Sequence, residues 1–238
     1  MVKSPFNCDQ DTVAFVNSQV LPLIPEHGFF IEPFLEKGSL FFSKPRVQTN
    51  LLNVADKETQ LALQYIRTCP KEFIERIYDI APHITDVEQL NYLKVRGSEI
   101  DNAVVWFCLN RYAIDGYDSF ETWSSYVREL SETLQGVRIT SDPLERLLAN
   151  ISTPAFLYFD SPYRDVADKE KALLLYFEMA MRLKENSQYL NFILKYDGCP
   201  LVKEMFDWVE FSEEKLQCQR RGNTHVYPNY DKSQFICW

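Results

Sequence analysis

Short apolar segments alternate with helical patterns along most of this chain, and this alternation limits the possible folds more than any other feature. The strand-like segments are residues 28–34, 48–56, 137–140, 155–159 and 188–196. Helical patterns separate them, for example from about Lys57 to Thr68 and from about Asp168 to Glu185. Strands that alternate with helices are typical of a mainly parallel sheet. The sequence therefore predicts an α/β fold.

Two regions depart from this alternation. Residues 70–135 look helical throughout, and the apolar segment 100–113 within them predicts a buried helix. The tail contains two strand-like pieces, around 209–218 and 233–238, joined by a basic loop. We therefore predict a core formed by residues 1–68 and 136–238, which ends in an antiparallel hairpin, and a helical insertion at 69–135.

Composition excludes several classes of protein. The net charge of −9 over 238 residues argues against non-specific nucleic-acid binding. The densest basic stretch, Lys215–His225, could be a local basic face or a solvated hairpin. The six cysteines and three histidines are scattered, so neither a metal site nor a disulfide framework is predicted. No apolar run is long enough for a membrane span, and we expect a cytoplasmic chain with no membrane partner.

Two predicted strands end in residues that could carry chemistry. One is followed by Phe34–Gly38, and the other ends at Asp160, Ser161, Pro162 and Tyr163. Asp, Ser and Pro are also ordinary turn residues, so the second segment could simply be a strand end. In open α/β sheets, however, ligands bind beyond the carboxyl ends of the strands. If the two strands are neighbours, both loops face one crevice.

The second of these loops suits the capture of an amino group. Asp160 and the carbonyl of Ser161 could accept its hydrogen bonds, and Tyr163 offers a stacking face. Pro162 has no N–H that would compete for these acceptors. Such a site suits the exocyclic amine of a nucleobase that has left the duplex.

Three segments resemble the Dam-type adenine-specific DNA methyltransferases. "FFIEPFLEKGSLFF" is similar to their cofactor loop, "DSPY" to their Asp-Pro-Pro-Tyr motif, and "AVVWFCLNRYAIDGY" to their Leu-Asn-Arg-Tyr segment. The order of the elements also agrees. The resemblance implies a Rossmann-like S-adenosylmethionine-dependent methyltransferase sheet with a small helical insertion for DNA recognition. It implies a monomer that methylates the exocyclic amino group of adenine in double-stranded DNA.

The resemblance also assigns roles to residues. Asp160 and the Ser161 carbonyl would grip the amino group, Pro162 would fix the turn, and Tyr163 would stack on the flipped adenine. The residues implied in S-adenosylmethionine binding are Glu32, Pro33, Phe34, Glu36, Gly38, Asp56 and Asp142. Helix capping explains Asp142 equally well, because Pro143 follows it at the start of a helical pattern.

The sequence departs from the family pattern where the cofactor would bind. Glu36 replaces a glycine, and Val54 stands where an acid for the ribose hydroxyls is expected, so that Asp56 could supply it only in a shifted loop. The N-terminal Gly-Gly-Lys segment of the family has no counterpart, and Ser161 replaces a proline. Residues 70–102 of the insertion are more acidic than basic. The alternative is therefore a catalytically degenerate homologue that acts as a DNA or protein interaction module.

Overall fold

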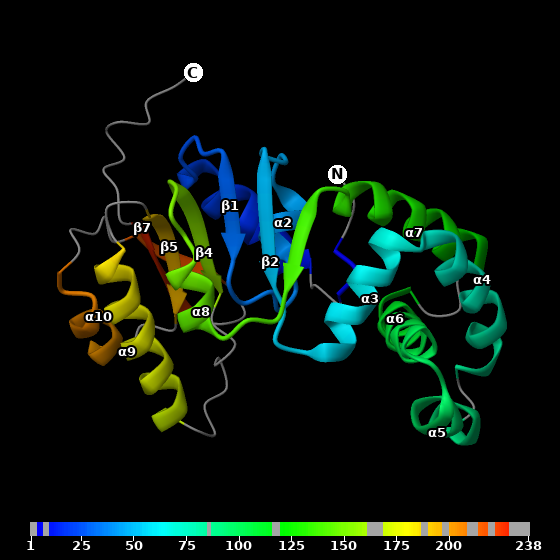
Figure 1. The fold of residues 1–238 in the computed structure, drawn as a ribbon. Helices are drawn as coiled ribbons and strands as arrows, with labels where there is room; N and C mark the ends of the chain where they lie inside the picture. The colour runs from blue at the N-terminus through cyan, green and yellow to red at the C-terminus, as the bar shows by residue number, and fades with distance from the viewer. Residues whose placement is uncertain are drawn as a thin grey trace.

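The structure is a computed structural model of the chain, and it is built around one seven-stranded sheet (Figure 1). It describes residues 4–6, 10–84, 87–115, 120–160, 169–186, 190–196, 200–208, 214–218 and 222–228. The strand order is β3-β2-β1-β4-β5-β7-β6. The strands are β1 (Phe29–Glu32), β2 (Thr49–Asn53), β3 (Val137–Thr140), β4 (Ala155–Asp160), β5 (Leu190–Tyr196), β6 (Glu214–Cys218) and β7 (Gly222–Pro228).

The five strands from β3 to β5 run parallel to one another. The mainly parallel α/β sheet predicted from the sequence is therefore confirmed. Strand β7 pairs antiparallel with both β5 and β6. It lies in the stretch that we expected to be a basic loop, so that part of the prediction is wrong. The second strand of the expected hairpin, at 233–238, falls outside the described residues.

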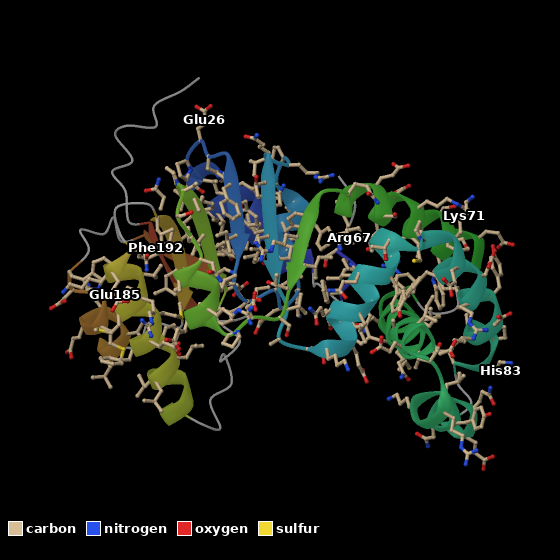
Figure 2. All side chains as sticks on the ribbon, in the orientation of Figure 1. Glu26, Arg67, Lys71, His83, Glu185 and Phe192 are labelled. Carbon is tan, nitrogen blue, oxygen red and sulfur yellow. The ribbon has the colours of Figure 1, made fainter. Side chains whose placement is uncertain are left out.

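Helices cover both faces of the sheet, and side chains alternate between two buried clusters. One face packs on α8 (Leu144–Ala149), α9 (Lys169–Glu185) and α10 (Pro200–Met205). Figure 2 labels Phe192, which is buried in this cluster. The other face packs on the N-terminal elements, on α2 and on the helices of the insertion, in one continuous cluster.

Two helices on this second face, α3 and α6, follow the predicted patterns. Helix α3 has the predicted bounds, and α6 is buried through its apolar middle, as expected from a segment without a polar face. The elements are α1 (Gln10–Phe15), η1 (Val16–Val20), η2 (Leu21–Leu23), α2 (Ser39–Ser43), α3 (Lys57–Thr68), α4 (Pro70–Ile80), η3 (Ala81–His83), α5 (Val87–Arg96), α6 (Glu99–Asp115) and α7 (Phe120–Leu134).

Hydrogen bonds join the helical insertion to the edge of the sheet. Arg67, at the end of α3, donates from Nη1 to the carbonyl of Val137 in β3 (Figure 2). Gln135 donates back from Nε2 to the Arg67 carbonyl at 3.0 Å. Arg46 donates from Nη1 to the carbonyl of Glu132, near the end of α7, at 3.2 Å. These bonds to main-chain acceptors thus fix α3 to β3, the end of the insertion to α3, and α7 to the segment before β2.

One predicted helix start is wrong. We expected Asp142 to cap the helix and Pro143 to be its first residue, but Pro143 is the N-cap and α8 begins at Leu144. The Asp142 backbone is held instead by Asn53, whose Oδ1 accepts from the Asp142 N–H at 2.8 Å. Pro143 has an extended ψ of 146°, so the helical conformation begins at Leu144.

Candidate functional site

The candidate site lies where the strand order reverses. Strand β1 pairs with β2 on one side and with β4 on the other, and both pairs are parallel. In an open α/β sheet this topological switch point is where a crevice forms beyond the carboxyl ends of the strands. Glu32 is the last residue of β1, and Asp160 is the last residue of β4. The strands are neighbours, as the expectation of a shared crevice requires.

The loop after β1 is held by main-chain bonds. Leu35 N–H donates to the Asn53 carbonyl at 2.9 Å, and Glu36 N–H donates to the Phe34 carbonyl at 3.0 Å. Gly38 then adopts a left-handed conformation with φ of 58°. A Cβ at Gly38 would lie 2.8 Å from the Phe42 ring, so a larger residue would strain this turn. This glycine is therefore needed for the local fold.

Asn53 connects the ends of three strands through its side chain. Its Nδ2 donates to the carbonyls of Pro33 and Asp142, each at 3.0 Å. Its Oδ1 accepts from Thr140 Oγ1 and from the Asp142 N–H, each at 2.8 Å. Both N–H groups of this buried amide and two acceptor positions of its oxygen thus bind residues at or next to strand ends. The arrangement fixes the loops after β1, β2 and β3 relative to one another.

A lysine faces the candidate catalytic acid. Asp160 and Lys195 are direct partners in the register of β4 and β5, and their side chains form an ion pair. Lys195 Nζ lies 3.2 Å from Asp160 Oδ1 and 3.2 Å from Oδ2. Asp160 is 7% exposed and Lys195 is 8% exposed. The ring of Phe15 in α1 lies 5.6 Å from Lys195 Nζ.

Glu32 is the second buried carboxyl group at this edge. It is 1% exposed, and among the described residues its Oε2 has no hydrogen-bond partner. Burial raises the pKa of Glu32 well above its ordinary value, and the neighbouring Asp160 raises this pKa further. A backbone hydrogen bond from Phe41 and the charge of Lys44 oppose these effects. Glu32 therefore tends to keep its proton.

Lys44, which follows α2, completes this group of buried charges. Its Nζ donates to the Pro45 carbonyl at 2.8 Å and lies 4.4 Å from the centre of the Phe30 ring. Burial lowers the pKa of Lys44 to about 8, although the charge of Glu32 favours the protonated form. We call Glu32, Lys44, Asp160 and Lys195 the edge cluster.

The described residues fit S-adenosylmethionine only in part. Gly38 is present in the loop after β1, as the resemblance requires, but it is buried against the Phe42 ring, and Val54 is buried and offers no acid. Asp56 is exposed and caps α3, since its Oδ2 accepts from Thr59 N–H at 2.7 Å. Asp142 pairs with Arg146 at 3.5 Å. Val54 thus offers no acid for the ribose hydroxyls, while Asp56 and Asp142, which contact Thr59 and Arg146, stay predicted cofactor residues.

Some predicted site residues cannot be placed. Ser161, Pro162 and Tyr163 lie outside the described residues, so their roles stay predictions. Sequence reasoning missed Lys44, Asn53 and Lys195. A signal for Lys195 was present, because it is the single charged residue near the end of a mostly apolar strand at the same edge as Asp160. Asn53 is the last residue of β2 and follows two buried leucines.

The described part of the chain contains neither a metal-binding cluster nor a membrane-spanning helix. Among the residues that the structure places, no group of three or more His, Cys, Asp or Glu side chains could hold a metal ion. None of the helices in the described ranges is long and apolar enough to cross a membrane.

The chain has a weak structural similarity to a known protein. No protein-family model matches the chain, and no curated protein matches it. Among solved structures, the chain is similar to the crystal structure of a possible methylase from Clostridium difficile 630. The sequences are 12% identical, the TM-score is 0.42, and the match covers 88% of this chain and 50% of that one. The chain spans about half the length of that protein.

Proposed function

We propose that this chain transfers a methyl group from S-adenosylmethionine to the exocyclic amino group of adenine in double-stranded DNA. The observation that carries the proposal is the position of Asp160, buried at the carboxyl end of β4 beside Glu32 at the end of β1. This is the switch point of the sheet, where an α/β fold binds its ligand. The resemblance of the loops at both strand ends to one methyltransferase family supports this chemistry.

The proposed role of Asp160 is to accept a hydrogen bond from the target amine. An exocyclic amine is a poor nucleophile because its lone pair is delocalised into the ring. An ionised acceptor favours a pyramidal nitrogen and stabilises the positive charge that develops on it during attack. S-adenosylmethionine, when bound, would supply the electrophilic methyl group. The carbonyl of Ser161 and the ring of Tyr163 are proposed to assist by accepting a second hydrogen bond and by stacking.

Specific observations favour a second candidate, the catalytically degenerate homologue that acts as an interaction module. Val54 is 1% exposed and apolar where a ribose-binding acid is implied. In addition, Lys195 already contacts both oxygens of Asp160. A homologue that had lost its cofactor could keep such a sheet and bind DNA or protein.

The test is transfer of labelled methyl from S-adenosylmethionine to mixed-sequence DNA, double-stranded and single-stranded. We expect measurable transfer by the wild type, and a loss of about 10²- to 10³-fold in Asp160→Ala, as for removal of a preorganised group that stabilises transition-state charge. Glu145→Ala, which removes an exposed carboxyl group on α8, is the matched control and should keep wild-type activity. Transfer that survives Asp160→Ala would place the chemistry elsewhere. Absence of transfer on any DNA would favour the interaction module.

A further inference from the structure

We propose that Lys195 is a positioning residue, which holds the Asp160 side chain ionised and oriented at the switch point. The inference rests on the proposed function, because it concerns the acid that would accept the target amine. Lys195 is not part of any of the sequence motifs, because it lies on the neighbouring strand, 35 positions along the chain. The structure brings it to the site.

The geometry of the pair fixes the orientation of the carboxylate. The backbones of Asp160 and Lys195 are in direct register on parallel strands, so both side chains leave the same face of the sheet. Nζ is equidistant from the two oxygens, at 3.2 Å. A carboxylate can accept several hydrogen bonds at once, so the contact with Lys195 is compatible with the proposed acceptance of a hydrogen bond from the amine.

The surroundings explain why a cation is needed here. Glu32 lies close enough to Asp160 for the two carboxyl groups to repel, and both are removed from water. The other cation of the edge cluster, Lys44, acts on Glu32 and contacts the Phe30 ring. From α1, the group that faces Lys195 is the uncharged ring of Phe15. Among the described residues, Lys195 thus places a cation in direct contact with Asp160, while Lys44 acts on the neighbouring Glu32.

Stability alone does not account for such a pair. Replacing a buried ion pair by apolar residues of similar volume is often neutral or stabilising, because removing charges from water is costly. Neighbouring titratable groups whose surroundings favour opposite protonation states are instead typical of sites that move or hold protons. In this site Asp160 would be the anionic acceptor, and Glu32 the acid that keeps its proton.

The experiment follows the side-chain carboxyl carbon of Asp160 by NMR between pH 3 and pH 9, in chains with labelled aspartate. Asp160→Asn assigns the signal. We compare the wild type with Lys195→Arg, which keeps the charge, and with Lys195→Met, which removes it. If Lys195→Met does not fold, Lys195→Gln replaces it. Neither S-adenosylmethionine nor DNA is needed, so the result does not depend on activity.

We expect the Asp160 signal of the wild type and of Lys195→Arg to remain that of a carboxylate to lower pH than in the uncharged variants. The difference should be about one to three pH units, the effect of an opposite charge at contact distance. The pH below which methyl-transfer activity falls should differ between the wild type and the uncharged variant by the same amount. If the Asp160 carboxyl signal changes over the same pH range in the wild type and in the uncharged variant, the proposal is overturned. If the Asp160 titration is displaced but no methyl transfer is measured, Lys195 still positions Asp160, and the proposed methyltransferase function is rejected instead.

Discussion

The core of the helical insertion and the edge cluster are both buried, but the first is mainly apolar and the second consists of charged side chains. Around α4, α6 and α7 most of the fully buried side chains are apolar, and Phe73 and Phe107 meet edge to face with ring centres 5.6 Å apart, although Asp101 and Arg111 are buried there too. Arg76 pairs with the buried Asp101 there at 2.8 Å, but Arg76 reaches solvent. At the edge cluster both members of the Asp160–Lys195 pair are buried.

The difference indicates that the insertion core serves stability and the edge cluster serves function. Apolar packing in the insertion needs no explanation beyond stability. Buried charges cost solvation energy that an apolar pair would not, so their presence at a switch point is typical of a functional site. We therefore expect the two regions to respond differently when side chains are removed.

The largest effect on stability is expected from Phe107→Ala. This ring is fully buried, and its removal leaves a cavity that should lower the free energy of unfolding by about 3–5 kcal/mol. Urea unfolding measures the loss. Phe177→Ala on α9, where the ring is mostly exposed, is the control and should change little. Equal losses at the two positions would mean that the insertion core is not packed as described.

In the edge cluster, a single removal should be costly and a double removal should not. Lys195→Met leaves Asp160 buried without its cation and should lower the free energy of unfolding by about 3–5 kcal/mol. Adding Asp160→Asn removes the remaining charge and should restore most of that loss. The same urea unfolding experiment measures both variants. A double variant as unstable as the single one would show that the pair contributes to stability in its own right.

A smaller effect is expected at the loop after β1. Gly38→Ala places a Cβ against the Phe42 ring and forces a left-handed conformation on alanine, which costs about 1–2 kcal/mol for the backbone alone. Gly28→Ala is the matched control, because nothing lies within 4 Å of a Cβ there. Thermal unfolding of both variants compares them, and an equal change would remove the steric argument for Gly38.

The smallest effect is expected on the pH dependence of the free energy of unfolding. Because the pKa of Glu32 is raised in the fold, the folded chain holds a proton that the unfolded chain releases above about pH 4.5. The contribution of Glu32 to stability therefore falls as the pH rises from there toward the folded pKa. Glu32→Gln removes this dependence, so its stability relative to wild type should increase with pH. Denaturant unfolding between pH 4.5 and pH 8 tests this, and a constant difference would contradict it.

Much of the fold could be predicted because each signal was local. The apolar middle of α6 and the alternation of strands with helices required no knowledge of distant partners. Strand β7 was not predicted, because its polar sequence "GNTHVYP" has no strong apolar alternation and its pairing with β5 is a tertiary effect. Asp142 failed as a cap for a similar reason, since Asn53 of a different strand holds its backbone.

The candidate site was predictable only in its strand-end residues. Glu32 and Asp160 follow apolar runs, and the parallel sheet brings such residues to one edge. Their partners come from other strands and loops. Lys195 becomes a contact of Asp160 only through the register of β4 with β5, and a single sequence does not give that register.

The most direct test of the central claim is titration calorimetry of S-adenosylmethionine with the wild type and with Glu36→Gly. The altered contacts at Glu36, Val54 and the N-terminal segment should together weaken binding by about two to four orders of magnitude, if each costs one to two kcal/mol. The account predicts weak saturable binding to the wild type, and binding strengthened about tenfold in Glu36→Gly. Absence of heat from both proteins at millimolar cofactor would contradict a methyltransferase site between β1 and β4.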